Sequence, residues 1–75
     1  MTNQEKSEAI KSYRKAHRLT QVELSAHLGY TSSVHINQIE SGKTPVSDEA
    51  MKVIIKAINE LDAIAISKAN EILNS

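Results

Sequence analysis

The sequence predicts an all-α fold, a compact bundle of five helices formed by a single domain over residues 1–75. Helix-capping patterns recur along the chain, whereas Val, Ile and Thr nowhere alternate with polar residues over the length of a strand. The two glycines and the single proline fall between the capped segments. With 40% hydrophobic residues, a chain of 75 residues can fill one small core.

Two capping boxes predict where the first two helices begin. Thr2 is followed three residues later by Glu5, so the threonine hydroxyl accepts from the Glu5 amide while the carboxylate reaches back. The helix that follows is expected to run to about His17. The same spacing recurs at Thr20 and Glu23, and it predicts a second, short helix.

Glycine and hydroxyl residues mark the limits of the later helices. Gly29 is expected to end the second helix, because glycine adopts the left-handed conformation without strain. Residues 31–33, Thr-Ser-Ser, offer three N-cap candidates for a third helix, which ends before Gly42. Ser47 and the two acids after it predict the start of a fourth helix.

The stretch 20–42 combines two short capped helices with a glycine turn between them, which is the pattern of a helix-turn-helix unit. Leu24 and Leu28 on the first helix are placed to meet Ile36 and Ile39 on the second. The remaining residues of the second helix are mostly short and polar. Such a face suits the base edges of the major groove of DNA.

Residues 10–46 resemble the Cro/cI-type helix-turn-helix domains of phage repressors and related small bacterial regulators. The resemblance lies in Arg14, in Leu19-Thr20-Gln21-Val22-Glu23-Leu24, in Leu28-Gly29, and in Ile36-Asn37-Gln38-Ile39-Glu40-Ser41-Gly42-Lys43 followed by Pro45. It implies a lambda repressor-like DNA-binding domain. The turn holds one extra residue around Tyr30-Thr31, so the cap of the third helix is Ser32 when counted from Glu40 and Thr31 when counted from Gly29.

The resemblance implies two kinds of contact with double-stranded DNA. Base edges would be read by four residues of the third helix: Ser33, Val34, Asn37 and Gln38. The sugar-phosphate backbone would be contacted by five others: Gln21, Thr31, Ser32, Ser41 and Lys43. Arg14 and Glu40 would form a structural ion pair inside the domain. Two alternatives stay open, because Val34 could instead pack on the second helix, and Tyr30 could either cover the core or donate to a phosphate.

The last segment, residues 60–75, is predicted to be a dimerisation helix. Its apolar residues spread over about 140° of the helix circumference, and Ile64 widens the stripe to about 200°, whereas packing on one core needs about 100°. We expect Ile64, Ile66 and Leu73 to meet a second copy of the chain. The alternative is a helix between two neighbours of the same chain. The sequence leaves open whether this segment is separate from the fourth helix.

Composition excludes several classes of protein. The chain lacks Cys, and the spacing of His17, His27 and His35 matches no metal signature, so we expect no metal and no cofactor. No nucleophile–base set or glycine-rich phosphate loop indicates an enzyme. No apolar run is long enough to span a membrane, which favours a cytoplasmic protein. We also expect no small-molecule ligand.

The net charge is zero, but the charges are unevenly distributed. Residues 1–46 contain six basic and four acidic side chains, and residues 47–75 contain three basic and five acidic side chains. The favoured hypothesis is a transcriptional repressor that binds a palindromic DNA operator as a homodimer. One alternative is an antitoxin or a restriction-system controller with the same fold. Another is a protein-interaction module without DNA affinity, which the zero net charge favours.

Overall fold

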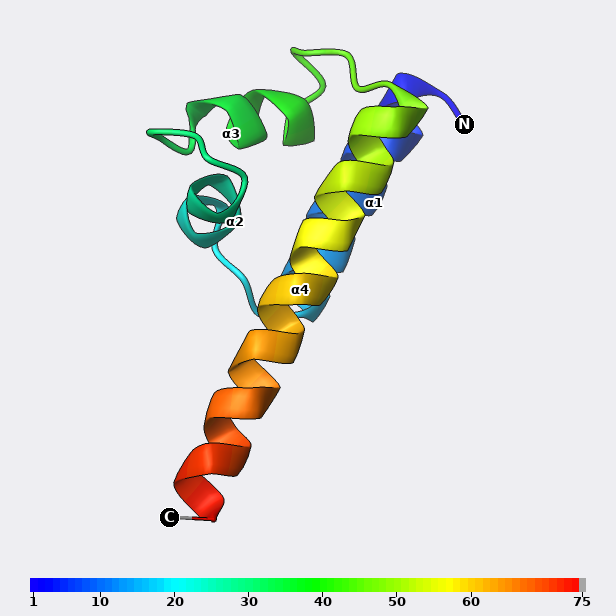
Figure 1. Ribbon diagram of the computed structural model, residues 1–75. Helices are drawn as coiled ribbons and strands as arrows, with labels where there is room; N and C mark the ends of the chain where they lie inside the picture. Colours follow the sequence, from blue (N-terminus) through cyan, green and yellow to red (C-terminus); the bar gives the residue numbers. More distant parts are fainter. Residues whose placement is uncertain (75) are drawn as a thin grey trace.

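The computed structural model describes residues 1–74, which form four α-helices and no β-strand (Figure 1). The helices are α1 (Asn3–Ala16), α2 (Gln21–His27), α3 (Val34–Glu40) and α4 (Asp48–Leu73). The all-α prediction is confirmed, but the prediction of five helices is wrong. The segments expected to be the fourth and fifth helices form one continuous helix of 26 residues. No Gly or Pro interrupts this stretch, so its backbone hydrogen bonds continue unbroken.

The predicted caps begin three of the four helices. Both capping boxes are formed: the Thr2 hydroxyl accepts from the Glu5 amide at 3.1 Å, and the Thr20 hydroxyl accepts from the Glu23 amide at 3.0 Å. The Ser47 hydroxyl likewise accepts from the amide three residues on, at the start of α4. Each cap satisfies a backbone donor that has no partner within its own helix.

The start of α3 decides among the three N-cap candidates in the sequence. The N-cap is Ser33, so the two positions counted from the family resemblance, Ser32 and Thr31, are wrong. The Ser33 side chain makes no capping hydrogen bond, while the Ser32 hydroxyl accepts from the Val34 amide at 3.4 Å. The extra turn residue is therefore accommodated ahead of the helix. The two glycines behave as predicted: Gly29, after α2, has a φ of 88°, and Gly42, after α3, has a φ of 82°.

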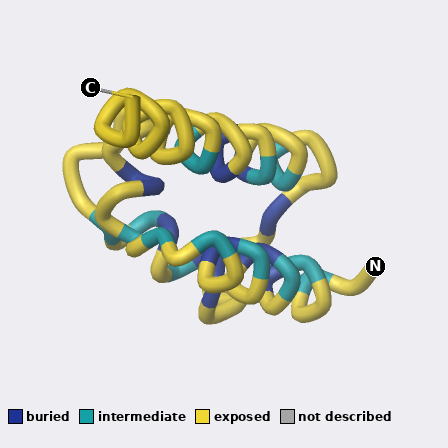
Figure 2. The backbone as a smooth tube through the Cα atoms, turned by 90° about the horizontal axis from the view of Figure 1, so that it is seen from below, coloured by how far each residue is buried: buried dark blue, intermediate teal, exposed yellow. Residues whose placement is uncertain are grey.

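The core lies where α1 and the first half of α4 close over α2 and α3. In Figure 2 the buried stretches of the chain face one another across the interior. The core is almost entirely aliphatic and draws on every helix and on the loop before α4: Ile10, Leu24, Ile36, Ile39, Val46, Ile54, Ala57 and Ile58. Burial of these side chains holds the short helices α2 and α3 in place, because helices of this length are marginal in isolation.

The second half of α4 leaves this core. The last buried residue of the helix is Ile58, and residues 63–74 are all exposed. In Figure 1 this end of α4, coloured orange to red, projects away from the other three helices. Within residues 1–74, none of the helices combines the length and apolarity that a membrane crossing requires.

Two histidine–carboxylate contacts lie where α4 leaves the body of the domain. His17 Nδ1, at the end of α1, is 3.5 Å from Asp62 Oδ2. His27 Nε2, at the end of α2, is 3.7 Å from Glu60 Oε2. The helix is thus contacted from two sides just before its exposed half begins.

Candidate nucleic-acid interface

One side of α3 packs on the core and the opposite side faces outward. Ile36, Ile39 and Glu40 are buried. The outer face of α3 consists of residues spaced three or four apart: Val34, Asn37, Gln38 and Ser41. Val34 is 57% exposed, Asn37 and Ser41 are exposed, and Gln38 is half-buried. This face carries no charged side chain, and three of its four residues can form hydrogen bonds.

An ion pair beneath this face joins α1 to α3. Arg14 Nε lies 2.7 Å from Glu40 Oε2, and Arg14 Nη2 lies 2.9 Å from Glu40 Oε1, so the contact is bidentate. Arg14 Nη1 also donates to the Leu19 carbonyl at 2.6 Å, in the connection before α2. The structural pair expected from the resemblance is therefore present, and Arg14 is buried and turned inward.

The electrostatics of this pair follow from its surroundings. Burial of the Glu40 carboxyl raises its pKa, but hydrogen bonds from Arg14 and Gln21, together with the charges of Arg14 and Lys11, outweigh that effect, so the pKa lies below its ordinary value. The hydrogen bond to Glu40 raises the pKa of the Arg14 guanidinium. Glu40 is consequently an ionised carboxylate at neutral pH, and it accepts hydrogen bonds without donating any.

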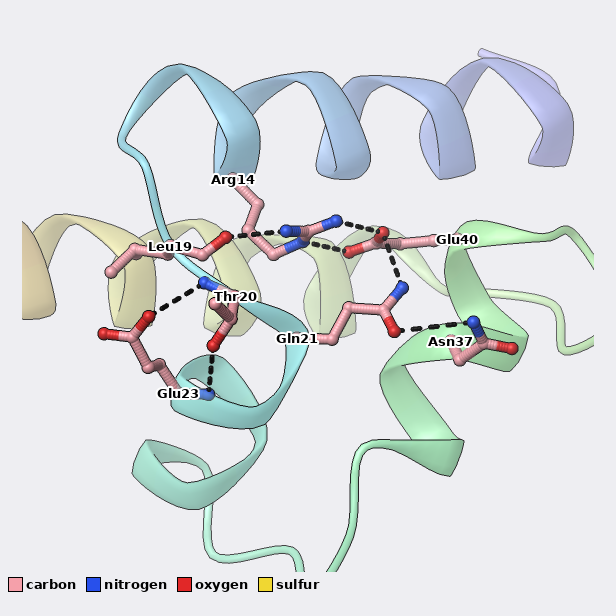
Figure 3. A network of polar contacts seen from close by, with 7 residues as sticks. All are labelled: Arg14, Leu19, Thr20, Gln21, Glu23, Asn37 and Glu40. Atoms are coloured by element: carbon pink, nitrogen blue, oxygen red, sulfur yellow. Dashed lines mark hydrogen bonds and ion pairs between the residues drawn. The ribbon is translucent and has the colours of Figure 1, made fainter.

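Gln21 connects the ion pair to the outer face of α3. Its Nε2 donates to Glu40 Oε1 at 3.1 Å, and its Oε1 accepts from Asn37 Nδ2 at 3.4 Å (Figure 3). Gln21 is the first residue of α2 and is half-buried. The resemblance implies a DNA-backbone contact for Gln21, whereas in the free protein its side-chain amide bonds with Glu40 and Asn37.

Two further polar contacts flank Gln38. The Thr44 hydroxyl lies 3.4 Å from Gln38 Oε1, and the Ser41 hydroxyl donates to the Gln38 carbonyl at 3.1 Å. Lys43, expected at the DNA backbone, is exposed in the loop between them. Thr44 was not predicted from the sequence, although its place directly after Lys43 and before Pro45 puts it in the same loop as the expected backbone contacts.

The turn before α3 contains an aromatic contact that the sequence did not predict. The rings of Tyr30 and His35 lie with their centroids 4.6 Å apart and their planes tilted by 48°. Tyr30 is 43% exposed, so it does not serve as a buried cover for the core. Thr31 and Ser32 are exposed beside it, and Ser33 is half-buried. The predicted DNA-contacting residues of the turn and of α3 therefore lie on adjoining surface.

One basic residue of α1, Lys6, is engaged away from this surface. Lys6 lies 2.8 Å from Asp48 and also donates to the Val46 carbonyl. The hydrogen bond from Lys6 and the charge of that lysine lower the pKa of the Asp48 carboxyl. Across residues 1–74, no group of three or more potential metal-ligating side chains comes together.

Comparison with protein families gives a match to the helix-turn-helix family over residues 10–64. The matched segment begins in α1, contains all of α2 and α3, and ends within α4. The chain belongs to the Cro/cI-type helix-turn-helix family. Comparison with curated proteins and with solved structures gave no significant match.

Cro/cI-type domains are DNA-binding regulatory domains and are not typically enzymatic. Membership therefore places the chain among DNA-binding regulators, with the helix-turn-helix formed by α2 and α3. The end of the family match at residue 64 also separates two parts of α4. Most of the exposed half of that helix lies beyond the segment that the Cro/cI-type family has in common.

Proposed function

We propose that the protein is a sequence-specific transcriptional repressor that binds a palindromic DNA operator as a homodimer. The observation that carries this proposal is the outer face of α3, which is exposed at three of its four residues, uncharged and rich in hydrogen-bonding groups on a helix-turn-helix of the Cro/cI type. A helix of this kind enters the major groove and contacts base edges. Protein interfaces, by contrast, favour aromatic and large apolar anchors.

The proposed contacts fall into two groups. Ser33, Val34, Asn37 and Gln38 contact base edges, with the Val34 side chain against a thymine methyl group. Gln21, Thr31, Ser32, Ser41 and Lys43 lie around them and contact the sugar-phosphate backbone. Exposure of Thr31, Ser32, Ser41 and Lys43 supports the second group, since each can reach a phosphate without displacing a neighbour.

The second copy is proposed to pack on the exposed half of α4. Ile64 is 47% exposed, Ile66 is 55% exposed and Leu73 is 81% exposed, which leaves large apolar side chains in water in a single chain. Pairing the same surface of two copies gives a two-fold dimer. Its two α3 helices would enter successive major grooves about 34 Å apart. One α3 alone contacts too few base pairs for useful specificity.

Occupancy of a promoter by the dimer is the proposed mechanism of repression. No ligand is needed for release, because protein concentration and ionic strength control the bound fraction.

The experiment is selection from a pool of random DNA duplexes at two salt concentrations, followed by titration of the selected duplex. The wild-type protein is expected to enrich a palindrome. Gln38→Ala should cost about 1–3 kcal/mol on the selected duplex and relax the preference at one base pair. Lys43→Ala should weaken all sequences alike, because a phosphate contact carries no sequence information. Equal retention of all duplexes by the wild type would contradict the proposal and leave only non-specific electrostatic binding, whereas retention of no duplex would favour a protein-interaction module.

A further inference from the structure

We infer that the exposed half of α4 in one copy lies antiparallel in a groove along the first half of α4 in the second copy. The inference rests on the proposed function, because it states how the proposed homodimer is built. It starts from two apolar surfaces of the same helix. One is a groove within residues 48–59, and the other is formed by side chains exposed on residues 63–74 (Figure 1).

The first surface, named the α4 groove, has a volume of about 580 Å³ and is lined only by residues of α4: Asp48, Met51, Lys52, Ile55, Lys56 and Asn59. Met51 and Ile55 are half-buried and pack against the core, so they form an apolar floor. Lys52 and Lys56 are exposed and form the rim. The stems of such lysines are apolar, while their ammonium groups stay in water. The α4 groove therefore suits apolar side chains of another helix.

The second surface lies on the same side of α4. Ile66 follows Ile55 by eleven residues and Leu73 follows Ile66 by seven, which are close to three and two full turns of helix. Ile64 follows Ile55 by nine residues, about two and a half turns, and so lies on the opposite side. The apolar stripe that begins in the α4 groove therefore continues through Ile66 and Leu73, both of which are exposed. The inference keeps these two residues of the proposed interface and leaves Ile64 outside it.

Two-fold symmetry determines the direction of the second helix. If Ile66 of one copy packs over Ile55 of its partner, a closed dimer requires the partner's Ile66 to pack over Ile55 of the first copy. Both contacts form together only when the two α4 helices run antiparallel. A parallel arrangement with the same contact would leave the second groove unfilled and would add further copies in an open chain.

The ends of the two helices also match in the antiparallel pair. Leu73 lies seven residues beyond Ile66, so it reaches the start of the partner's groove, at the partner's Asp48. The partner's Lys52, one turn further on, then lies beside the last turn of α4. That turn carries no basic side chain of its own. The carbonyl end of a helix attracts positive charge, so the rim of the groove and the helix end are complementary.

The length of the contact favours this arrangement over pairing of the exposed halves alone. Antiparallel pairing extends over all 26 residues of α4, about 39 Å, whereas residues 63–74 alone cover about 18 Å. The longer contact removes both apolar surfaces of each chain from water, and the shorter one leaves both grooves open. Most of the inserted part also lies beyond the family match at residue 64, so it is a feature of this chain.

Disulfide cross-linking tests the contact directly, because the chain has no cysteine of its own. Ile55→Cys and Ile66→Cys are prepared separately, one of them ¹⁵N-labelled so that the mixed dimer is recognised by its mass. They are then mixed and mildly oxidised at a concentration where the wild type is dimeric. The mixed dimer should be the main covalent product, since a disulfide requires Cα atoms within about 7 Å. Each variant alone should stay unlinked, as should the matched control Ile64→Cys, and thermal unfolding checks that all three are folded.

A second measurement changes only exposed side chains, so the core stays intact. Lys52→Glu reverses the charge beside the partner's helix end and should raise the dimer Kd in sedimentation about 3- to 30-fold, because the contact occurs twice in each dimer. Lys68→Glu is the matched control. Lys68 follows Ile66 by two residues and therefore points about 200° away from it, so this variant should leave the Kd unchanged.

Two results would overturn the inference while the proposed homodimer stands. One is cross-linking of Ile66→Cys or of Ile64→Cys to itself, and the other is a Kd for Lys52→Glu no higher than that for Lys68→Glu. A wild type that sediments as a monomer at every concentration would remove the proposed homodimer and the inference together. Selection from random duplexes reports separately whether the chain binds DNA.

Discussion

The two halves of α4 have similar apolar content but opposite surroundings. The first half buries Ile54, Ala57 and Ile58 against α1 and α2, whereas residues 63–74 carry isoleucine and leucine side chains that are exposed. The same helix therefore serves the fold in one half and leaves an apolar surface in the other. Hydrophobic residues at helical spacing therefore indicate that one face of a helix is buried, but they do not indicate whether it packs within the same chain or against a second copy.

The largest expected effect comes from truncating a side chain in the first half of α4. Ile58 is fully buried, so Ile58→Ala should lower the free energy of unfolding by about 2–5 kcal/mol through lost burial and the cavity left behind. Ile66→Ala makes the same chemical change in the second half and is the matched control. Urea unfolding at a concentration where the chain is monomeric should separate the two. Equal losses would show that both halves belong to one core.

A smaller effect is expected at the start of the same helix. Ser47→Ala removes the hydroxyl that accepts from the Ala50 amide at 3.1 Å and should lower the free energy of unfolding by about 1 kcal/mol. Thermal unfolding measures this loss, and Ser47→Asp should restore most of it because aspartate is an equally good N-cap. Failure of Ser47→Asp to exceed Ser47→Ala would contradict the capping role.

The smallest effect on unfolding, and the clearest effect on assembly, is expected from Ile66→Asp. Because Ile66 is 55% exposed, the free energy of unfolding of the monomer should change by no more than about 0.5 kcal/mol. A buried aspartate would destabilise the proposed interface between copies, so sedimentation should give a dimer for the wild type and a monomer for the variant. An unchanged mass would remove this face from the dimer.

Much of the fold could be predicted because its signals are local. Thr2, Thr20 and Ser47 act on amides three residues away, and Gly29 and Gly42 adopt the left-handed backbone that ends their helices. The continuity of α4 is different in kind. The absence of Gly and Pro permits one continuous helix without excluding a break between two helices, so the sequence left both possibilities open.

The sequence predicted the candidate interface only in part, because several of its contacts depend on tertiary packing and have no local sign in the sequence. The pairing of Arg14 with Glu40 followed from a family resemblance, since their separation in sequence gives no local sign of contact. The bond between Gln21 and Glu40, and the tilted ring contact between Tyr30 and His35, depend on how α2 and the longer turn pack against α3. The cap at Ser33 depends on the same turn, because three hydroxyl residues in a row satisfy the local pattern equally well.

The central claim is that α3 reads DNA through its outer face, and NMR mapping with the selected duplex tests it most directly. On addition of that duplex, the Val34 methyl groups and the side-chain amides of Asn37 and Gln38 should show the largest shifts. The Ile72 methyl groups, on the exposed half of α4, should show none beyond those of the dimer itself. Shifts centred on residues 63–74, with the three α3 side chains unchanged, would contradict the account.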